Sequence, residues 1–353
     1  MAWPTPQFSK TQVNKAGEIL AANTIFDKDL LWAVGVVDNW RSCHGYPINT
    51  FQATLRHKLK NIDSNAIVAQ RLKRMFSIVG KLRRFENMQL ARMQDIGGLR
   101  AVVSNLKRVR KLEKNYLNSR FNHDHVASYD YIEHPKTSGY RGIHLVYKYK
   151  NHRVPEYNGL LIELQIRTEL QHAWATAVET MGTFLNHALK SSEGPDVWLD
   201  FFSLTGSAFA HIEKTQPVLG YEKLSPIETF AEVIAEAENL QIKDRLQAFS
   251  IAAKRIHIDR KPGSYHLVIL NPDEKTVEVR TYSAVNLSMA GKDYTAIETR
   301  IAEGAPLQAV LVSAGSIENL QRAYPNYFLD THKFLQQLQR IERNYKLLTK
   351  VST

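Results

Sequence analysis

Residues 161–168 read Leu-Ile-Glu-Leu-Gln-Ile-Arg-Thr, and this stretch decides the fold. Polar and apolar side chains alternate along it with the period of a β-strand. Glu163, Gln165 and Arg167 therefore share one face, and the aliphatic residues between them share the other. A carboxylate, an amide and a guanidinium are costly to bury unless a ligand, a metal or each other satisfies them. The strand predicts a polar site on one face of a sheet, with Glu163 as the first candidate catalytic group.

The sequence on both sides of this strand predicts a mixed α/β sheet flanked by helices. Further strands are expected at 99–104, 141–150, 265–270, 276–282 and 309–313. Helical spacing is expected at 10–22, 27–40, 64–85, 169–190, 332–348 and, with breaks, 197–256. These changes of pattern predict a larger unit at 1–225, a helical connector at 226–258, and a smaller α+β unit at 259–353.

Length and composition indicate a globular chain that can bury a sizeable core, with 353 residues and 44% hydrophobic content. The sequence contains no run of 18 apolar residues, and its first fifteen residues lack the apolar region of a signal peptide. We therefore expect a soluble cytoplasmic protein without a membrane partner. Cys43 is the only cysteine, so we expect neither an intramolecular disulfide nor zinc bound by cysteines.

Positive charge is concentrated in one part of the sequence. The net charge is +11, and residues 51–111 hold fifteen Lys and Arg against three acids. Such a segment attracts polyanions, either RNA or nucleoside polyphosphates, although a solvated basic face is the plainer interpretation. Charge alone does not choose between RNA and nucleotide.

Two clusters of residues that precede the strand at 161–168 suit phosphate chemistry. In the helix expected at 64–85, Lys73, Ser77 and Lys81 recur every fourth residue and would line one face that clamps a triphosphate. Asp95 precedes an expected strand, where one or two acids together with phosphate oxygens would hold Mg²⁺. Taken singly, the first cluster is also typical of an exposed helix face, and Asp95 of a turn.

A third cluster is the Gly/Ser-containing loop that begins at Lys136 and ends at His144. It presents Tyr140, on which a base would stack, and Arg141 among the cations that would hold phosphates. An isolated tyrosine is more often a packed core ring. The order of basic cluster, acid, aromatic loop and polar strand is nevertheless a complete set for moving a phosphoryl-type group from a nucleotide to a hydroxyl.

With these motifs in this order, roughly residues 60–185 resemble the synthetase domain of the RelA/SpoT homologue family. The motifs are the basic cluster, the turn from Asp95 to Arg100, the loop Lys-x-x-Gly-Tyr-Arg-x-x-His, and Glu-Leu-Gln-Ile-Arg-Thr-x-x-x-His-x-Trp-Ala. The resemblance implies a pyrophosphokinase, in which Mg-ATP donates its β,γ-pyrophosphate to a ribose 3′-hydroxyl and AMP is released.

The resemblance also implies roles for individual residues. The ATP subsite would be formed by Arg71, Lys73, Ser77, Lys81 and Arg100, with the two arginines on either side of the adenine. The catalytic group would be Asp95, Glu163, Gln165 and Arg167, with Mg²⁺ on the first two and Glu163 as the general base. The acceptor subsite would be formed by Lys136, Tyr140, Arg141 and His144. An RNA acceptor would need further phosphate contacts, for which the basic patch offers Lys107, Arg108 and Arg110.

Some features depart from the alarmone synthetases of this family. The segment after Trp174 differs, Gly142 stands where serine is usual, and too few residues precede Arg71 to hold a hydrolase domain. The pattern is closer to the toxic small alarmone synthetases, many of which pyrophosphorylate the 3′-terminal adenosine of the tRNA CCA end and so stop translation. The alternative is synthesis of (p)ppGpp or (pp)pApp from a free nucleotide.

The two-part layout resembles the fused toxin–antitoxin CapRel type. There, a zinc-finger-like domain without zinc ligands inhibits the toxin in cis, a Tyr-x-x-Tyr motif plugs the ATP site, and a phage structural protein, typically the major capsid protein, releases the block. Tyr324 and Tyr327 match that motif, although Pro325 also suits an ordinary type I turn. A third interpretation, a catalytically inactive RNA-binding protein, is disfavoured because Asp95 and Glu163 are both present.

Overall fold

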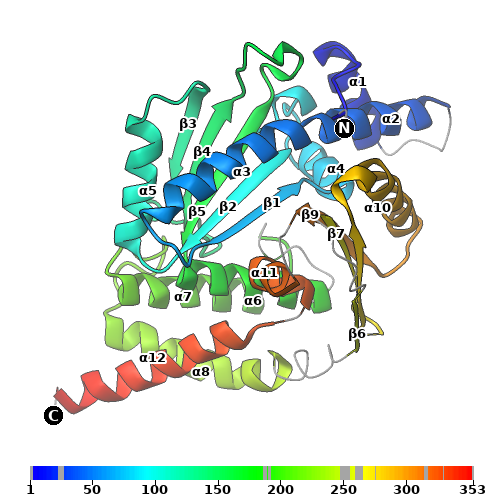
Figure 1. The fold of residues 1–353 in the computed structure, drawn as a ribbon. Helices are drawn as coiled ribbons and strands as arrows, with labels where there is room; N and C mark the ends of the chain where they lie inside the picture. The colour runs from blue at the N-terminus through cyan, green and yellow to red at the C-terminus, as the bar shows by residue number, and fades with distance from the viewer. Residues whose placement is uncertain are drawn as a thin grey trace.

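A single mixed sheet organises the chain. The computed structural model describes residues 3–22, 28–185, 189, 192–246, 255–258, 265–274, 276–313, 317–328 and 330–351. Within these residues the strands form one sheet in the order β3-β4-β5-β2-β1-β9-β7-β8-β6 (Figure 1). Their bounds are β1 Ile67–Leu72, β2 Gly97–Val103, β3 Asp124–Asp130, β4 Ile143–Lys148, β5 Leu161–Thr168, β6 Arg255–Ile258, β7 Tyr265–Asn271, β8 Thr276–Tyr282 and β9 Gln308–Ser313.

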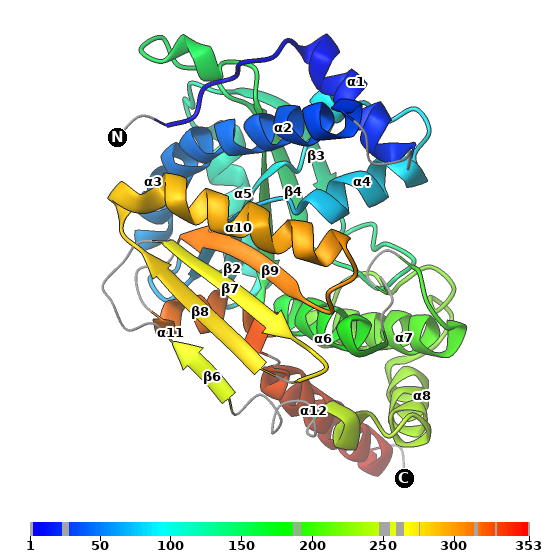
Figure 2. The ribbon, with the colours of Figure 1, turned by 90° about the vertical axis from the view of Figure 1, so that its right-hand side faces the viewer.

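Helices lie on both faces of this sheet, which confirms the predicted mixed α/β class (Figures 1 and 2). Their bounds are α1 Lys10–Ala21, α2 Lys28–Cys43, α3 Gly45–Lys60, α4 Met75–Arg84, α5 Leu106–Asn118, α6 Glu169–Leu185, α7 Asp196–Glu213, α8 Pro226–Asn239, α10 Leu287–Ala302, α11 Ile317–Ala323 and α12 His332–Val351. A short 3₁₀ turn, η5, covers Pro325–Phe328. No described helix is long and apolar enough to cross a lipid bilayer.

The helix expected at 64–85 is wrong in its first half. Residues 67–72 form strand β1, which pairs antiparallel with β2 from Ile67 opposite Val102 to Leu72 opposite Gly97. The helix α4 begins only at Met75. Ile67 and Val68 are β-branched and favour a strand, and pairing within the sheet overrides the helical spacing of the cations that follow. Two of the three basic-cluster residues remain on α4, whereas Lys73 precedes it.

Other predicted elements agree more closely, but some were missed. The strands expected at 99–104, 141–150 and 265–270 correspond to β2, β4 and β7. The helical region expected to reach residue 256 is wrong at its end, because 255–258 form β6 beside β8. Strand β3 and helices α3, α5, α10 and α11 were not foreseen.

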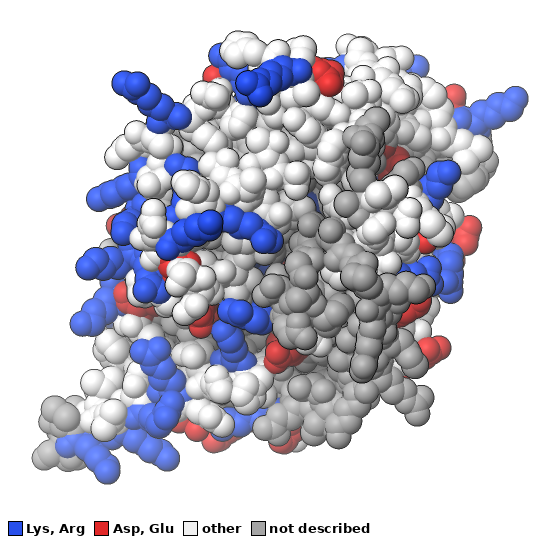
Figure 3. All heavy atoms as spheres, in the orientation of Figure 1, with Lys and Arg blue, Asp and Glu red and all other residues white. Residues whose placement is uncertain are grey.

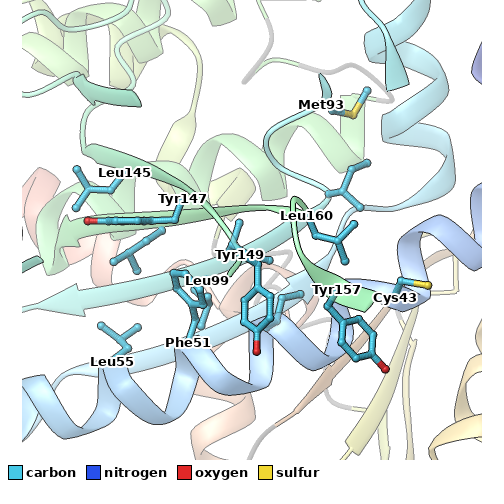
Figure 4. Packing of buried hydrophobic residues seen from close by; sticks show 14 of the residues in the cluster. Cys43, Phe51, Leu55, Met93, Leu99, Leu145, Tyr147, Tyr149, Tyr157 and Leu160 are labelled. Atoms are coloured by element: carbon cyan, nitrogen blue, oxygen red, sulfur yellow. The ribbon is translucent and has the colours of Figure 1, made fainter. Parts of the chain in front are cut away.

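One face of the sheet is covered by a long helix. α3 lies across β1 and β2 (Figure 1), and its residues Phe51 and Leu55 are buried beneath the strands. Figure 4 shows Tyr149 pointing toward this helix, and the Phe51 and Tyr147 ring centroids lie 5.8 Å apart. This core fixes the plane of the central strands, so the opposite face of β2 and β5 is free to carry polar groups.

The sheet continues from the larger expected unit into the smaller one. Strand β9 pairs antiparallel with β1, with Val312 opposite Arg71, and on its other side it pairs with β7. Figure 2 shows β7, β8 and β9 beneath α10 and continuous with the strands behind them. The C-terminal strands are therefore joined to β1, and only β1 separates β9 from β2.

Candidate active site

Five side chains, from β4, β5 and the loop that precedes β4, form a continuous hydrogen-bonded chain on one face of the sheet. The Tyr140 hydroxyl lies 2.5 Å from His144 Nε2, and His144 Nδ1 lies 2.7 Å from Glu163 Oε1. Gln165 Nε2 donates to Glu163 Oε2 at 2.7 Å. Arg167 Nη2 then donates to Gln165 Oε1 at 2.6 Å. The strand that was predicted to carry polar groups on one face does so, and the groups satisfy one another.

Strand register explains why these groups meet. β4 runs antiparallel to β5 with His144 opposite Gln165, which places the histidine on the face that carries Glu163. β2 runs parallel to β5 with Arg100 opposite Gln165, so Arg100 joins the same face. Sequence alternation alone located the β5 residues, but the contribution of the neighbouring strands depended on register.

Glu163 is buried and strongly held as a carboxylate. Its residue exposure is 8%. Burial alone would raise its pKa, but the His144 ring, the hydrogen bonds from His144 and Gln165, and the charge of Lys73 together hold the pKa well below its ordinary value. Both carboxylate oxygens have partners within the chain, so an acceptor hydroxyl can approach only if one of these contacts opens.

Asp95 lies between two lysines of the basic cluster. Lys73 Nζ is 2.6 Å from Asp95 Oδ2, and Lys81 Nζ is 3.0 Å from Asp95 Oδ1. Burial would raise the pKa of Asp95, but these lysines lower it, and the charge of Glu163 acts in the opposite direction. The structure therefore brings Asp95 together with Lys73 and Lys81, which were predicted to bind phosphate. The Asp95 carboxylate lies between the two ammonium groups, where a phosphate of the nucleotide would bind.

The two carboxylates suit magnesium better than zinc. Among the described residues, no group of three or more His, Cys, Asp or Glu side chains is arranged to hold a metal. Mg²⁺ typically takes one or two carboxylates and completes its coordination with phosphate oxygens and water. Asp95 and Glu163 influence each other electrostatically across the site, so this donor set fits Mg²⁺ that arrives with a nucleotide.

The predicted adenine subsite contains a residue from the C-terminal part. The Tyr324 hydroxyl donates to the backbone oxygen of Gln70, the residue before Arg71. Tyr324 is 3% exposed. Burial raises its pKa, and the neighbouring Arg100 and Arg71 partly oppose that rise. Tyr324 thus lies beside both arginines that the resemblance places around the adenine.

The second tyrosine of the motif lies on the same face. Tyr327 belongs to η5, is buried, and packs in a cluster with Ile67 of β1 and Val102 of β2. The pKa of Arg74 is raised, most strongly by Tyr327. The predicted Tyr-x-x-Tyr pair therefore covers β1 and β2 beside the basic cluster, although the sequence also allowed an ordinary turn.

Several buried side chains near this face have nitrogen atoms that make no hydrogen bond within the described residues. Arg100 Nε, Arg167 Nε and Nη1, and both ring nitrogens of His172 are buried and make no hydrogen bond. Burial and then the charge of Arg167 lower the pKa of Arg100 to about 10. Burial, followed by the same two arginines, lowers the pKa of His172 well below its ordinary value. His172 was not among the predicted site residues, and its only signal was its place in the motif after β5.

The acceptor loop is closed onto α7. Gly139 has a φ of +90°, and a Cβ added there would lie 2.7 Å from the backbone oxygen of Phe202, so glycine is required. Ser203 Oγ donates to the Thr137 oxygen at 2.8 Å. Tyr140 is 4% exposed, with Arg167 Cζ lying over its ring at 4.9 Å. A base can stack on Tyr140 only after this loop moves.

Other predicted acceptor residues are distributed differently. Lys136 Nζ lies over the rings of Tyr131 and Tyr140 at 4.5 and 5.5 Å, so it stays near the site. Arg141 does not: its Nη2 lies 2.9 Å from Glu213 Oε2 of α7, where both side chains are buried. The structure therefore places Arg141 where it fixes the base of the loop.

The predicted RNA patch on α5 is only partly free. Arg108 Nη1 lies 2.9 Å from Asp63 Oδ2. Arg110 Nη1 lies 2.5 Å from Asp130 Oδ2 and 3.1 Å from Glu113 Oε2. Lys107 is exposed. Two of the three predicted contacts are thus engaged in ion pairs within the chain.

A buried ionic contact between α2, α4 and α10 was missed entirely. Glu298 of α10 accepts a hydrogen bond at 2.9 Å from the backbone N–H of Met75, the first residue of α4. Its other oxygen lies 2.8 Å from Arg41 Nη1, and Arg41 Nε donates to the Lys73 oxygen at 3.0 Å. No local pattern could have revealed it, because Met75 and Glu298 are 223 residues apart.

Comparison with known proteins supports the resemblance for the middle of the chain. Residues 70–183 match the model described as the region found in RelA / SpoT proteins. The GTP pyrophosphokinase YjbM of Bacillus subtilis is 37% identical over 111 residues, covering 31% of this chain and 52% of that protein. The uncharacterized protein Rv1366 of Mycobacterium tuberculosis is 30% identical over 133 residues, covering 38% and 45%. The chain spans about half the length of these curated relatives.

Two solved structures are also similar to part of the chain. Small alarmone synthetase 1 of Bacillus subtilis, bound to its product pppGpp, is 27% identical and covers 48% of this chain and 90% of its own, with a TM-score of 0.40. A GTP pyrophosphokinase family protein from Streptococcus pneumoniae is 26% identical, covers 48% and 86%, and has a TM-score of 0.41. The matched region contains the basic cluster, Asp95, the acceptor loop and β5.

Proposed function

We propose that this protein is a pyrophosphokinase that transfers the β,γ-pyrophosphate of ATP to a ribose 3′-hydroxyl. The supporting observation is Glu163, a buried carboxylate on the same face as Arg100 and electrostatically linked to Asp95 and Lys73. In such a transfer the 3′-oxygen attacks the β-phosphorus, the bond from that phosphorus to the α,β-bridging oxygen breaks, and AMP leaves. Positioned charge supplies most of the rate enhancement.

Each residue of the site would have a separate role in this reaction. Lys73 and Lys81 would exchange Asp95 for the donor phosphates, and Asp95 and Glu163 would hold Mg²⁺, which neutralises phosphate charge. Arg71 and Arg100 would hold the adenine. Glu163 would take the proton of the acceptor hydroxyl once its contact with the His144 ring opens.

We further propose that the acceptor is the 3′-terminal adenosine of tRNA, so that the protein is a toxin that stops translation. Support comes from the departures after Trp174 and from the basic exposed surface of α5. The second candidate is an alarmone synthetase that uses a free nucleotide, favoured by the names of the relatives that match residues 70–183. Both candidates share the donor chemistry and differ in the acceptor.

We also propose that the C-terminal part keeps the enzyme inactive. Tyr324 is buried, its hydroxyl donates to the backbone oxygen of Gln70, and the charges of Arg71 and Arg100 act on it. An aromatic ring can stack on guanidinium groups, so Tyr324 would compete with the adenine. Because the segment is tethered, its local concentration is of millimolar order, so weak contacts suffice. Release by a phage structural protein, such as a major capsid protein, is part of this proposal and rests on the resemblance to the CapRel type.

The test uses the full-length chain. Wild type and Tyr324→Ala are incubated with γ-³²P-ATP, Mg²⁺, bulk tRNA and GDP, each with and without Glu163→Gln. Label on tRNA that disappears with Glu163→Gln is the expected result. Label on GDP alone would replace the tRNA acceptor with the second candidate. A complete lack of label in both backgrounds would overturn the pyrophosphokinase proposal.

A further inference from the structure

The C-terminal helix α12 presents a stripe of cations that no described acidic side chain neutralises. Its buried side is fixed by Phe334, Leu338 and Ile341, which pack against α6, α7 and α8. Its exposed side carries a set of cations at helical spacing: Arg340, Arg343 and Lys346. The ion pairs of α12 within the described residues include Lys333 with Glu169 and Glu342 with Lys243, and none involves Arg340, Arg343 or Lys346.

A second stripe of the same kind lies on α5. Lys107, Lys111 and Lys114 are exposed and recur at i, i+4 and i+7, so they line one face of the helix. The arginines of α5 are directed elsewhere, to Asp63 and Asp130. The cations of α5 that make no ion pair with the described residues therefore form a row of lysines, which includes Lys107 of the predicted patch but neither of its arginines.

The two stripes face the same side of the molecule. In Figure 1, α5 and the end of α12 both lie along the left edge, with α7 between them. Figure 3 shows Lys and Arg side chains along that edge, over α5 and again over the end of α12. α7 is also the helix that holds the acceptor loop, through Ser203 and the Thr137 oxygen. The helix that holds the acceptor loop thus lies between the two stripes in this view.

We infer that α12 is the second half of an RNA-binding surface, which runs from Lys107, Lys111 and Lys114 of α5 to Arg340, Arg343 and Lys346 of α12. The ligand chemistry is a phosphate backbone, because separated rows of exposed cations match phosphates along a strand and show no pocket chemistry for one base. This inference rests on the proposed tRNA acceptor and extends it. The C-terminal part then has two roles, closing the donor site and holding the body of the RNA.

A consequence concerns the order of events. RNA can engage α5 and α12 while Tyr324 still covers the donor site, since neither stripe includes a residue of β1 or β2. Loss of the C-terminal part would open the donor site but would also weaken RNA binding. The inference therefore predicts that release occurs by a shift of η5 while α12 remains docked.

The test measures binding of fluorescent bulk tRNA to the full-length chain by anisotropy, across a series of salt concentrations. One variant combines Arg340→Gln, Arg343→Gln and Lys346→Gln, and a second combines Lys107→Gln, Lys111→Gln and Lys114→Gln. The matched control changes three exposed lysines at the other side of the molecule: Lys10→Gln, Lys15→Gln and Lys28→Gln. Thermal unfolding checks that each variant is folded.

For wild type, the logarithm of affinity should fall steeply with the logarithm of salt concentration. Each lost phosphate contact lowers that slope by about 0.7 to 0.9, so the α12 and α5 variants should each lose about 2 to 3, while the control keeps the wild-type slope. An unchanged slope in the α12 variant, with a reduced slope in the α5 variant, would overturn the inference alone. Lack of salt-dependent tRNA binding by wild type would overturn the tRNA acceptor as well.

Two exposed side chains make one comparison necessary. Leu347 and Leu348, near the end of α12, are 63% and 37% exposed, and a basic helix with exposed leucines can also bind anionic membranes. Vesicles of phosphatidylcholine with one-fifth phosphatidylserine, present in the same assay, should not compete with tRNA. Displacement of the tRNA by these vesicles would replace the RNA surface with a membrane surface.

Discussion

At the scale of single residues, the site is held closed by contacts that the sequence could not specify. The face of β5 was predictable, because alternation with a period of two fixes which side chains share it. The partners of Glu163 were not, because His144 reaches it through the register of β4. Asp95 could be named from motif order, and its partners Lys73 and Lys81 belong to the predicted basic cluster, but their ion pairs with it could not be predicted.

A buried histidine gives a prediction about acid stability. Burial lowers the pKa of His44 to about 4, and its Nδ1 lies 2.8 Å from the Trp40 oxygen. The unfolded chain takes up a proton below about pH 6.5, so stability is fully present above that pH and falls as the pH drops toward 4. From pH 7 to pH 5 this group should remove about 2 kcal/mol. Denaturant unfolding of wild type and His44→Gln at both pH values measures it, and an equal loss in both proteins would contradict the assignment.

At the scale of elements, the close approach of α7 to the acceptor loop fixes the position of that loop. A Cβ on Gly206 of α7 would lie 2.7 Å from Gly139 Cα and 2.8 Å from the Gly139 oxygen. Backbone atoms cannot yield cheaply, so Gly206→Ala should displace the loop and reduce pyrophosphate transfer by roughly 10-fold or more, because misplaced reacting groups are costly. Gly35→Ala on α2 is the matched control, since nothing lies within 4 Å of its Cβ position. Equal transfer rates for the two variants would show that α7 does not set the loop.

The wrong prediction at β1 shows that local sequence patterns do not determine an element whose conformation depends on pairing within the sheet. The cations after residue 70 follow helical spacing, and the chain up to Leu72 is nevertheless a strand. Pairing with β2 and β9 decides the matter, and neither partner is near β1 in the sequence. Helices α3 and α10 were missed for a related reason, because their buried faces are defined by the sheet that they cover.

At the scale of the whole molecule, a buried ionic contact links the C-terminal part to the basic cluster. Arg41 is 2% exposed and Glu298 is 12% exposed. Glu298→Ala leaves the guanidinium without its nearest anion, which should destabilise the fold by about 3 kcal/mol and loosen α10 from α4. Glu303→Ala, an exposed change at the end of the same helix, is the control. Denaturant unfolding checks the loss, and equal stability of the two variants would remove Glu298 from the account.

The same contact predicts a change in activity. If α10 helps to close the site, Glu298→Ala should transfer pyrophosphate faster than wild type under conditions where both are folded. The rate of label transfer from γ-³²P-ATP measures this. A slower rate, with an unchanged KM for ATP, would indicate that Glu298 supports the active arrangement of α4 and does not help to inhibit it.

The central claim is that the chain contains a complete pyrophosphokinase site that its own C-terminal part covers. The most direct measurement is the initial rate of label transfer from γ-³²P-ATP by full-length wild type, Tyr324→Phe and Tyr324→Ala. Tyr324→Phe loses only the hydrogen bond to the Gln70 oxygen, worth about 1 kcal/mol, and should be several-fold faster than wild type. Tyr324→Ala also loses the ring and should be faster still. Equal rates for all three proteins would contradict the account.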